Sequence, residues 1–226
     1  MSLDLQLQIT LLSDATFGRG DGVAGLIDEE VEYDETSGLP FIRGRVLKGL
    51  LTEECANVLY ALNMEQRSLF KTAAEALFGN PGSKAKQSRL NVSDAELPAE
   101  LREAVFASIQ AKVLSTAAVL ESLTALRRQT AVDEESGAPE KGSLRTMRVV
   151  LRGTVFTAPL AVDGDLDPAT KALLAACALA LRRGGTGRNR GRGRLQACLM
   201  QRENDAWRDV TVDFFAPFKT LVGVTI

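Results

Sequence analysis

The segment Gly184–Arg194 alternates glycines with arginines, a combination suited to binding phosphate. Glycine lets a backbone approach a ligand closely and expose its N–H groups, and arginine forms bidentate, permanently charged contacts with phosphate. The segment follows an expected helix and precedes an expected strand, the opposite order from a P-loop or a dinucleotide-binding turn. We therefore expect a loop that binds a phosphodiester backbone; a flexible surface linker is the alternative. The expected contacts are Gly185, Gly187, Arg188, Arg190, Arg192 and Arg194.

A second basic segment stands where a strand is expected to run into a helix. The strand is predicted over Leu39–Ile42, and apolar residues at helical spacing predict a helix from Val46 to Leu62. Arg43, Arg45 and Lys48 would then surround the helix N-terminus, where backbone N–H groups and the helix dipole also favour an anion. The alternative is a first helical turn that carries solvated bases.

The absence of histidine limits the catalytic chemistry. It excludes histidine-dependent triads, Cys–His dyads, histidine-ligated zinc and the paired imidazoles of metal-free ribonucleases. Catalysis would have to rest on carboxylates, lysine, arginine or a metal with oxygen ligands. Six acids fall within the eight residues Asp28–Glu35, and six arginines fall within the thirteen residues Arg182–Arg194. With a net charge of only -2, this segregation is compatible with a local anion-binding face; two solvated surface loops are the alternative.

The composition is that of a soluble globular protein. The chain has 226 residues, of which 45% are hydrophobic and 25% charged, which excludes wholesale disorder and a disulfide-rich miniprotein. Three widely spaced cysteines, Cys55, Cys177 and Cys198, make a disulfide framework or structural zinc unexpected. No apolar run approaches the roughly 20 residues needed to cross a bilayer, and the N-terminus lacks the pattern of a secretion signal. We expect a cytoplasmic protein with no membrane partner.

Hydrophobic periodicity and turn residues predict the order of the elements. Leu3–Leu11 alternates as a half-buried strand, 13–25 is a glycine-rich loop, and Met64–Phe78 is a helix that ends at Gly79. Pro168–Leu181 is a helix capped by Asp167. The other expected segments are a strand at 88–95, mostly helix at 98–120, a protruding loop at 130–143, extended chain at 147–156, a strand at 195–200 and a tail of mixed strand and coil.

This order indicates the α+β class. The order matches the βαββαβ scheme of a ferredoxin-like, RRM-type core that carries large insertions: a strand, a helix, strands with insertions, a helix and a strand. We find no tandem repeat, so the simplest prediction is a single domain over residues 1–226. The aromatic motifs of ordinary RRM sheets are absent, so recognition of single strands by base stacking on the sheet is not expected.

Several short motifs, in their order along the chain, resemble one family. They are Gly25-Leu26-Ile27-Asp28 after the first glycine-rich loop, Leu47-Lys48-Gly49 at the first helix, Leu77-Phe78-Gly79, Ser88-Arg89-Leu90, the pair Leu126–Asp133 and Gly142–Thr146, and Gly184–Arg194. By these motifs taken together, the chain resembles the RAMP superfamily of CRISPR-associated proteins, and specifically the repeated backbone subunit of type III effector complexes.

The resemblance implies a fold and a set of partners. It implies an RRM-like core with a lid and helical region at about 64–125 and a thumb hairpin at about 126–148. Copies would assemble head to tail along a CRISPR RNA, with other effector subunits. The palm of each copy would hold guide phosphates, and the thumb, with Arg127, Arg128 and Arg145, would contact the duplex of guide and target RNA.

The resemblance also implies a role for Asp28. In members that cleave, an aspartate between the first glycine-rich loop and the Leu-Lys-Gly helix is required to cut target RNA with a divalent cation, such as Mg²⁺, and Asp28 matches that position. A carboxylate there could hold the metal while the 2′-hydroxyl aligns with the phosphorus. The family's usual proline and two serines are replaced here by Arg43, Arg45 and Val46, which leaves open whether this subunit cuts. The alternatives are a non-catalytic RNA-binding filament subunit and a CRISPR RNA-processing nuclease, the latter weakened by the missing histidine.

Overall fold

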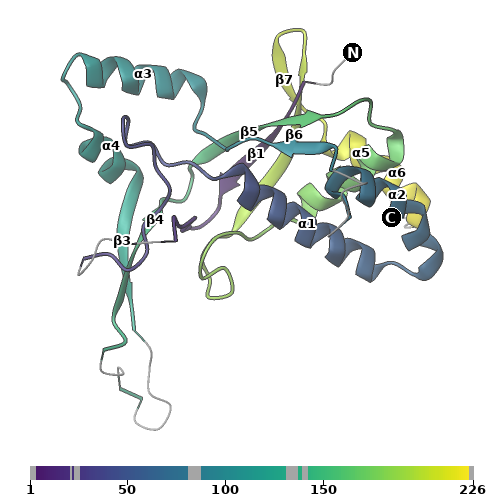
Figure 1. The fold of residues 1–226 in the computed structure, drawn as a ribbon, viewed down its shortest axis with the longest axis horizontal. Helices are drawn as coiled ribbons and strands as arrows, with labels where there is room; N and C mark the ends of the chain where they lie inside the picture. The colour runs from purple at the N-terminus through teal and green to yellow at the C-terminus, as the bar shows by residue number, and fades with distance from the viewer. Residues whose placement is uncertain are drawn as a thin grey trace.

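A five-stranded antiparallel sheet forms the centre of the molecule (Figure 1). The computed structural model describes residues 4–20, 22, 26–80, 88–130, 137–138 and 142–223. The strands are β1 (Leu5–Leu11), β2 (Leu90–Val92), β5 (Val155–Val162), β6 (Leu195–Glu203) and β7 (Ala206–Asp209), in the order β2-β5-β1-β6-β7. Alternate residues of β1 are buried, as the apolar alternation of this strand predicts. The class is therefore α+β.

Four helices gather beside this sheet: α1 (Gly44–Ala61), α2 (Met64–Phe78), α5 (Pro168–Ala180) and α6 (Thr211–Val222). Leu47 and Leu51 of α1, Phe70 of α2 and Leu173 of α5 are fully buried in the one hydrophobic core that these helices share with β1. The predicted boundaries of α2 are confirmed, because Asn63 forms a reciprocal capping box at its start and Gly79 ends it with a positive φ. Asp167 caps α5, also as predicted.

A second, two-stranded sheet extends away from the first (Figure 1). It consists of β3 (Thr124–Gln129) and β4 (Arg145–Val150), paired antiparallel from Thr124 with Val150 to Gln129 with Arg145. The helices α3 (Ala99–Gln110) and α4 (Thr116–Leu123) precede it, so the helical stretch predicted at 98–120 is two helices. Part of the protruding loop predicted at 130–143, namely residues 131–136 and 139–141, lies outside the described residues, as do residue 21 and residues 23–25 of the first glycine-rich loop.

Two predicted elements differ from the structure. Leu39–Ile42 is not a strand: it makes single bridges, Pro40 with Tyr33 and Ile42 with Ala95, because it passes between separate neighbours instead of following one strand. The tail is predicted as mixed strand and coil; its strand is confirmed by β7, but the chain then forms the helix α6 despite Pro217 within it. Phe218 of α6 stacks on Phe70 of α2 with ring centroids 4.7 Å apart, so tertiary packing stabilises a helix that local propensity disfavours.

Among the helices of the described residues, none combines the length and apolar character that spanning a membrane requires.

Candidate functional site

A groove of about 400 Å³ lies where three distant parts of the chain meet. Its lining includes 16–18 after β1, Arg43 and Glu53 at α1, and Gly185 and Arg188 from the loop between α5 and β6. The Thr186 N–H donates to the Thr16 carbonyl at 2.8 Å, which holds this loop against the chain after β1. The two basic segments predicted from the sequence therefore border one groove, which we call the α1 groove.

Glycines allow the loop between α5 and β6 to lie in this place. Gly185 has φ +80°, and a Cβ there would meet the Thr16 carbonyl oxygen. Gly193 has φ +66°, and a Cβ there would meet the carbonyl oxygen of Gly184 across the neck of the loop. Gly187 also has a positive φ, but a Cβ there would meet only a side-chain carbon of Arg192, at an ordinary contact distance. Gly185 thus has a structural role in bringing the loop to the groove.

Both arginines of the α1 groove are paired with carboxylates. Arg43 donates twice to Glu32, at 2.5 and 2.9 Å, and Glu32 is buried. Arg188 donates twice to Glu53, at 2.8 and 2.9 Å. In each case the hydrogen bond with glutamate raises the pKa of the guanidinium above its ordinary value. The groove therefore carries two arginines and two glutamates, and its formal charge balances.

The N-terminus of α1 is also occupied. The Gly44 N–H donates to the Asp94 carboxylate at 2.7 Å, so the helix N-terminus predicted to receive a phosphate is capped by a side chain. Arg45 is exposed and forms no ion pair with any residue that the structure describes. Lys48 is half-buried, and this burial lowers the pKa of its ammonium group. Arg45 and Lys48 lie one helical turn apart, so they share one face of α1 and remain available to an anion.

Asp28 is attached to β4 of the β3–β4 hairpin, at Thr146. Its backbone N–H donates to the Thr146 carbonyl at 2.8 Å, and the Thr146 N–H donates to its carboxylate at 2.6 Å. The Asp28 side chain is exposed, and its Oδ1 accepts no hydrogen bond from the described residues. The next residue, Glu29, accepts a hydrogen bond of 2.5 Å from the Thr186 hydroxyl. The acidic segment therefore links the hairpin, through Asp28, to the rim of the α1 groove, through Glu29.

Most of the other acids in this segment have structural partners. Glu30 is buried and accepts from Arg148 at 2.8 Å, and Glu32 holds Arg43. Asp34 accepts from Thr36 and Ser37 in a turn, and the hydrogen bond from the Thr36 hydroxyl lowers the pKa of its carboxyl. The alternative of a solvated surface loop is therefore wrong for Glu30 and Glu32, which are buried and bind arginines.

The basic residues predicted on the hairpin divide into two kinds. Arg127 is held by Asp14, with both of its hydrogen bonds to one carboxylate oxygen, at 2.8 and 3.0 Å. Arg128 and Arg145 are exposed and form no ion pair within the described ranges. These two project from opposite strands near the outer end of the described hairpin, because Arg128 pairs with Thr146 and its neighbour Gln129 pairs with Arg145.

The arginines of the loop between α5 and β6 have different surroundings. Arg188 turns to Glu53 of α1, whereas Arg192 donates to the Met147 sulfur of β4. Arg190 is exposed and has no ion pair in the described part of the chain. Arg194 does not border the α1 groove and lines another concavity, together with Arg182 and Arg183. The sequence-predicted loop thus contributes to more than one surface.

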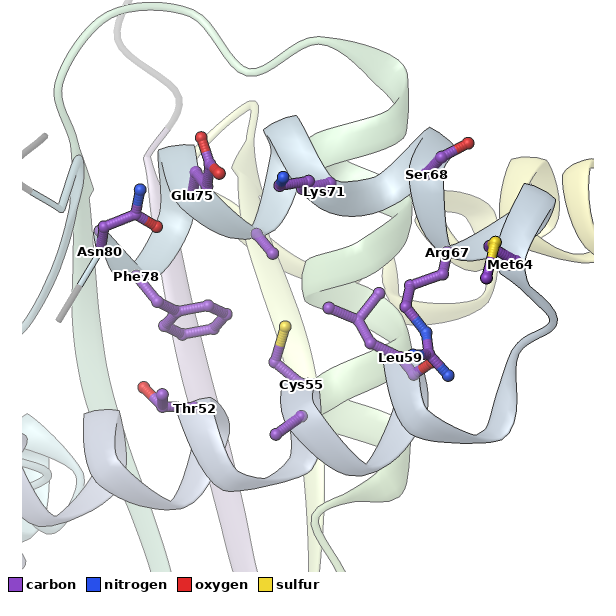
Figure 2. A pocket seen from close by; sticks show the side chains of 13 residues that line it. Thr52, Cys55, Leu59, Met64, Arg67, Ser68, Lys71, Glu75, Phe78 and Asn80 are labelled. Carbon is purple, nitrogen blue, oxygen red and sulfur yellow. The ribbon is translucent and has the colours of Figure 1, made fainter.

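A further concavity, of about 620 Å³, lies between α1 and α2 (Figure 2). Cys55 and Leu59 of α1 face Phe78 of α2 across it, and its lining is mainly apolar. Arg67 donates to backbone carbonyls at the end of α1, including Leu59, and so connects the two helices. None of the site residues predicted from the sequence lines this concavity.

The described residues contain no cluster of three or more metal-binding side chains. Mg²⁺ is often bound by one or two carboxylates together with substrate phosphates. Asp28, with one oxygen engaged by Thr146 and the other without a protein partner in the described chain, fits the role of a single ligand. The described residues alone do not supply a complete metal site there.

The family model of the RAMP superfamily matches residues 8–196. The chain belongs to the RAMP superfamily. Its fold is similar to that of a chain in a cryo-EM structure of the type III-B Cmr-beta bound to cognate target RNA, with a TM-score of 0.63, 15% sequence identity and coverage of 95% of this chain and 98% of that chain. A chain of the type III-B Cmr-beta in the apo state matches with a TM-score of 0.61 and 16% identity over 89% of this chain and 98% of that one. No curated protein matches the sequence.

The carboxylates that organise this RAMP site escaped the sequence analysis. Glu53 lies on α1 as an ordinary exposed helix residue, and nothing local marks it as the partner of Arg188, 135 residues away. Glu32 was visible only as one acid in a run. Arg148 and Thr146 of β4 likewise gain their roles from the long-range contact between the hairpin and the acidic segment.

Proposed function

We propose that this RAMP protein is the CRISPR RNA-binding backbone subunit of a type III effector complex and that it cleaves target RNA beside Asp28. One observation carries the proposal: the α1 groove gathers the basic segments of α1 and of the glycine–arginine loop, and the acidic segment that borders it fixes Asp28 to the hairpin. The similarity to chains of the type III-B Cmr-beta, one of them bound to cognate target RNA, supports the same assignment.

In this proposal the core is ferredoxin-like. The strands β2, β5, β1 and β6 are adjacent in that order and antiparallel, with α1 between β1 and β2 and α5 between β5 and β6 along the chain. That arrangement supports the βαββαβ scheme, with α2–α4 and the β3–β4 hairpin as insertions. Further copies of the subunit would continue the RNA path head to tail, with other effector subunits at the ends.

The protein's own residues have separable roles in this mechanism. Arg45 and Lys48 on α1 and Arg190 on the loop contact guide phosphates as charges that no described carboxylate neutralises. Arg128 and Arg145 on the hairpin contact the guide–target duplex and help to splay one nucleotide, which aligns a 2′-hydroxyl with its phosphorus. Asp28 lies beside β4 of that hairpin, and the Thr146 N–H holds its carboxylate in one orientation. A divalent cation, when bound, would neutralise charge at the scissile phosphate.

A specific observation favours the second candidate, a non-catalytic filament subunit. The Asp28 carboxylate accepts a hydrogen bond from the hairpin backbone, as a purely structural residue would, and the described residues offer it no second metal ligand. In that case Asp28 would position the hairpin and RNA would be bound without cutting.

The test compares the parent protein with Asp28→Asn and Asp28→Ala after assembly with guide RNA, target RNA and Mg²⁺. Asparagine retains an oxygen that can accept from Thr146 but removes the charge. A catalytic role predicts that Asp28→Asn binds guide and target as the parent does and cuts about a hundredfold more slowly or worse. Regular cutting by Asp28→Asn at the parental rate, or binding without cutting by the parent, would favour the structural role.

A further inference from the structure

A second groove, of about 610 Å³, lies at the end of α5 and is separate from the α1 groove. We call it the β6 groove, because β6 and the start of α6 form much of its wall. No lining residue is shared between the two grooves. Its charged lining residues are Arg182, Arg183, Arg194 and Asp209.

The cations of the β6 groove have no carboxylate partner. Arg182, Arg183 and Arg194 are all exposed, and none forms an ion pair with the chain that the structure describes. The single acid of the lining, Asp209, accepts from the Thr211 N–H at 2.9 Å and from its hydroxyl at 2.5 Å. These hydrogen bonds from Thr211 outweigh the effect of partial burial, so the pKa of the Asp209 carboxyl is lowered and it stays ionised. Three arginines and one acid leave this groove positive, whereas the two arginines and two glutamates of the α1 groove balance.

The backbone holds the arginines of the β6 groove together. Arg183 and Arg194 form a bridge at the neck of the glycine–arginine loop, where the Gly184 N–H donates to the Gly193 carbonyl at 2.9 Å. The Leu195 N–H donates to the Arg182 carbonyl at 3.0 Å. Beyond this neck the same loop delivers Arg188 to the α1 groove. One short loop therefore connects the two grooves, so that a strand lying along it would reach both.

The lining also offers apolar surface beside the charges. Leu12, Leu179 and Val212 are 49%, 37% and 66% exposed and line the same groove. An isolated phosphate or an acidic side chain would make little use of them, whereas a nucleic acid strand presents phosphates together with the faces of bases and riboses. Guanidinium groups contact phosphate oxygens in bidentate geometry without requiring a particular base.

We propose that the β6 groove binds the sugar–phosphate backbone of single-stranded RNA that continues past the glycine–arginine loop from the α1 groove. This inference rests on the proposed function, since it assumes that RNA occupies the α1 groove. It assigns Arg182 and Arg183 a role in RNA binding and gives Arg194 a place distinct from that of Arg188. A strand long enough to fill both grooves binds more tightly and with a steeper salt dependence than one confined to the α1 groove.

The first test measures binding of oligouridylates of increasing length to the full chain. Three double variants are compared with the parent. Arg182→Gln with Arg183→Gln alters the β6 groove, and Arg45→Gln with Lys48→Gln alters α1. The control, Lys71→Gln with Lys112→Gln, removes the same charge from exposed positions away from both grooves. We expect the Arg182/Arg183 variant to bind the shortest RNA as the parent does and to lose the gain in affinity with length. For long RNA, loss of two phosphate contacts should lower the salt slope by about 1.4. The Lys71/Lys112 control should leave both the gain in affinity with RNA length and the salt slope unchanged.

The second test uses Cys198, which lines the β6 groove and is partly exposed, while Cys55 and Cys177 are buried. Long RNA should slow modification of the Cys198 thiol by a methanethiosulfonate, and short RNA should not. The inference would be overturned if Cys198 were modified at the same rate with and without long RNA and the Arg182/Arg183 variant kept the parental affinity at every RNA length. That result would leave the proposed function intact. If the Arg45/Lys48 variant binds every RNA as the parent does, the proposed function fails instead. Protection of Cys198 by a second copy of the protein without RNA would assign the groove to a protein contact and also overturn the inference.

Discussion

Glu53 holds Arg188 through two hydrogen bonds of 2.8 and 2.9 Å, between the middle of α1 and the glycine–arginine loop. Each guanidinium of the α1 groove is thus already bound to a carboxylate in the free subunit. In the proposed RNA complex, a phosphate group would have to exchange with that carboxylate before the arginine could contact RNA. We therefore expect the acids to weaken the affinity of the α1 groove for RNA, and the exposed Glu53 offers a test of this expectation.

Substitution Glu53→Gln should strengthen RNA binding. The substitution removes the negative charge that holds Arg188, so that this arginine can contact a phosphate. One additional phosphate contact on single-stranded RNA steepens the slope of log affinity against log salt concentration by about 0.7. Binding isotherms at several salt concentrations measure the effect, with Glu103→Gln on α3, an exposed position that loses the same charge, as the control. An affinity gain equal to that of Glu103→Gln would mean that Arg188 does not contact RNA.

The pair of Glu30 and Arg148 should matter mainly for stability. Its side chains are only 6% and 15% exposed, and Arg148 also donates to the Thr124 hydroxyl at 3.2 Å. Substitution Arg148→Leu leaves a buried carboxylate without its cation and should lower the free energy of unfolding by about 3 kcal/mol. Urea denaturation measures this, and adding Glu30→Gln should restore part of the loss. For comparison, Arg202→Ala, which removes exposed ion pairs, should cost less than about 1 kcal/mol. A similar small loss for Arg148→Leu would contradict the prediction.

Gly193 and Gly191 form a matched pair of loop positions. Both have positive φ, +66° and +82°, but a Cβ at Gly193 meets the Gly184 carbonyl whereas a Cβ at Gly191 meets nothing within 4 Å. Substitution Gly191→Ala should cost only the backbone strain, about 1 kcal/mol. Gly193→Ala should cost more and should also weaken RNA binding, because it opens the neck of the loop. Thermal unfolding and RNA affinity of the two variants test this; equal effects would show that the neck is not required.

The cap of α5 predicts a dependence on pH. The Thr170 hydroxyl donates to the Asp167 carboxylate at 2.5 Å, and this hydrogen bond, with those from backbone N–H groups, lowers the pKa of Asp167 below its ordinary value of 3.8. Since the folded pKa is the lower one, this stabilisation is present above pH 3.8 and is lost as the pH falls through the folded value. Substitution Asp167→Ala should cost about 1 kcal/mol at neutral pH. Denaturation at a series of pH values should show that its difference from the parent shrinks below pH 3.8, and a constant difference would contradict the assignment.

Local patterns predicted several elements closely. The helix from Met64 to Phe78 is set by Asn63, Gln66 and Gly79, all within one turn of its ends, so its boundaries needed no tertiary information. The strand β1 followed from strict alternation. The helix α6 was missed because Pro217 and a run of phenylalanines disfavour a helix locally, and the stacking of Phe218 on Phe70 that compensates comes from a distant segment.

The sequence by itself determined the chemistry available to this protein: a glycine–arginine loop, a basic helix start, an acidic segment and no histidine. Only the tertiary structure decided which charges remain available to a ligand. Arg43, Arg127 and Arg188 are bound by acids 11, 113 and 135 residues away, whereas Arg182, Arg183 and Arg194 have no ion-pair partner in the described chain. Ion pairing depends on distances of a few ångströms in space, and the separation of two residues along the chain does not determine that distance.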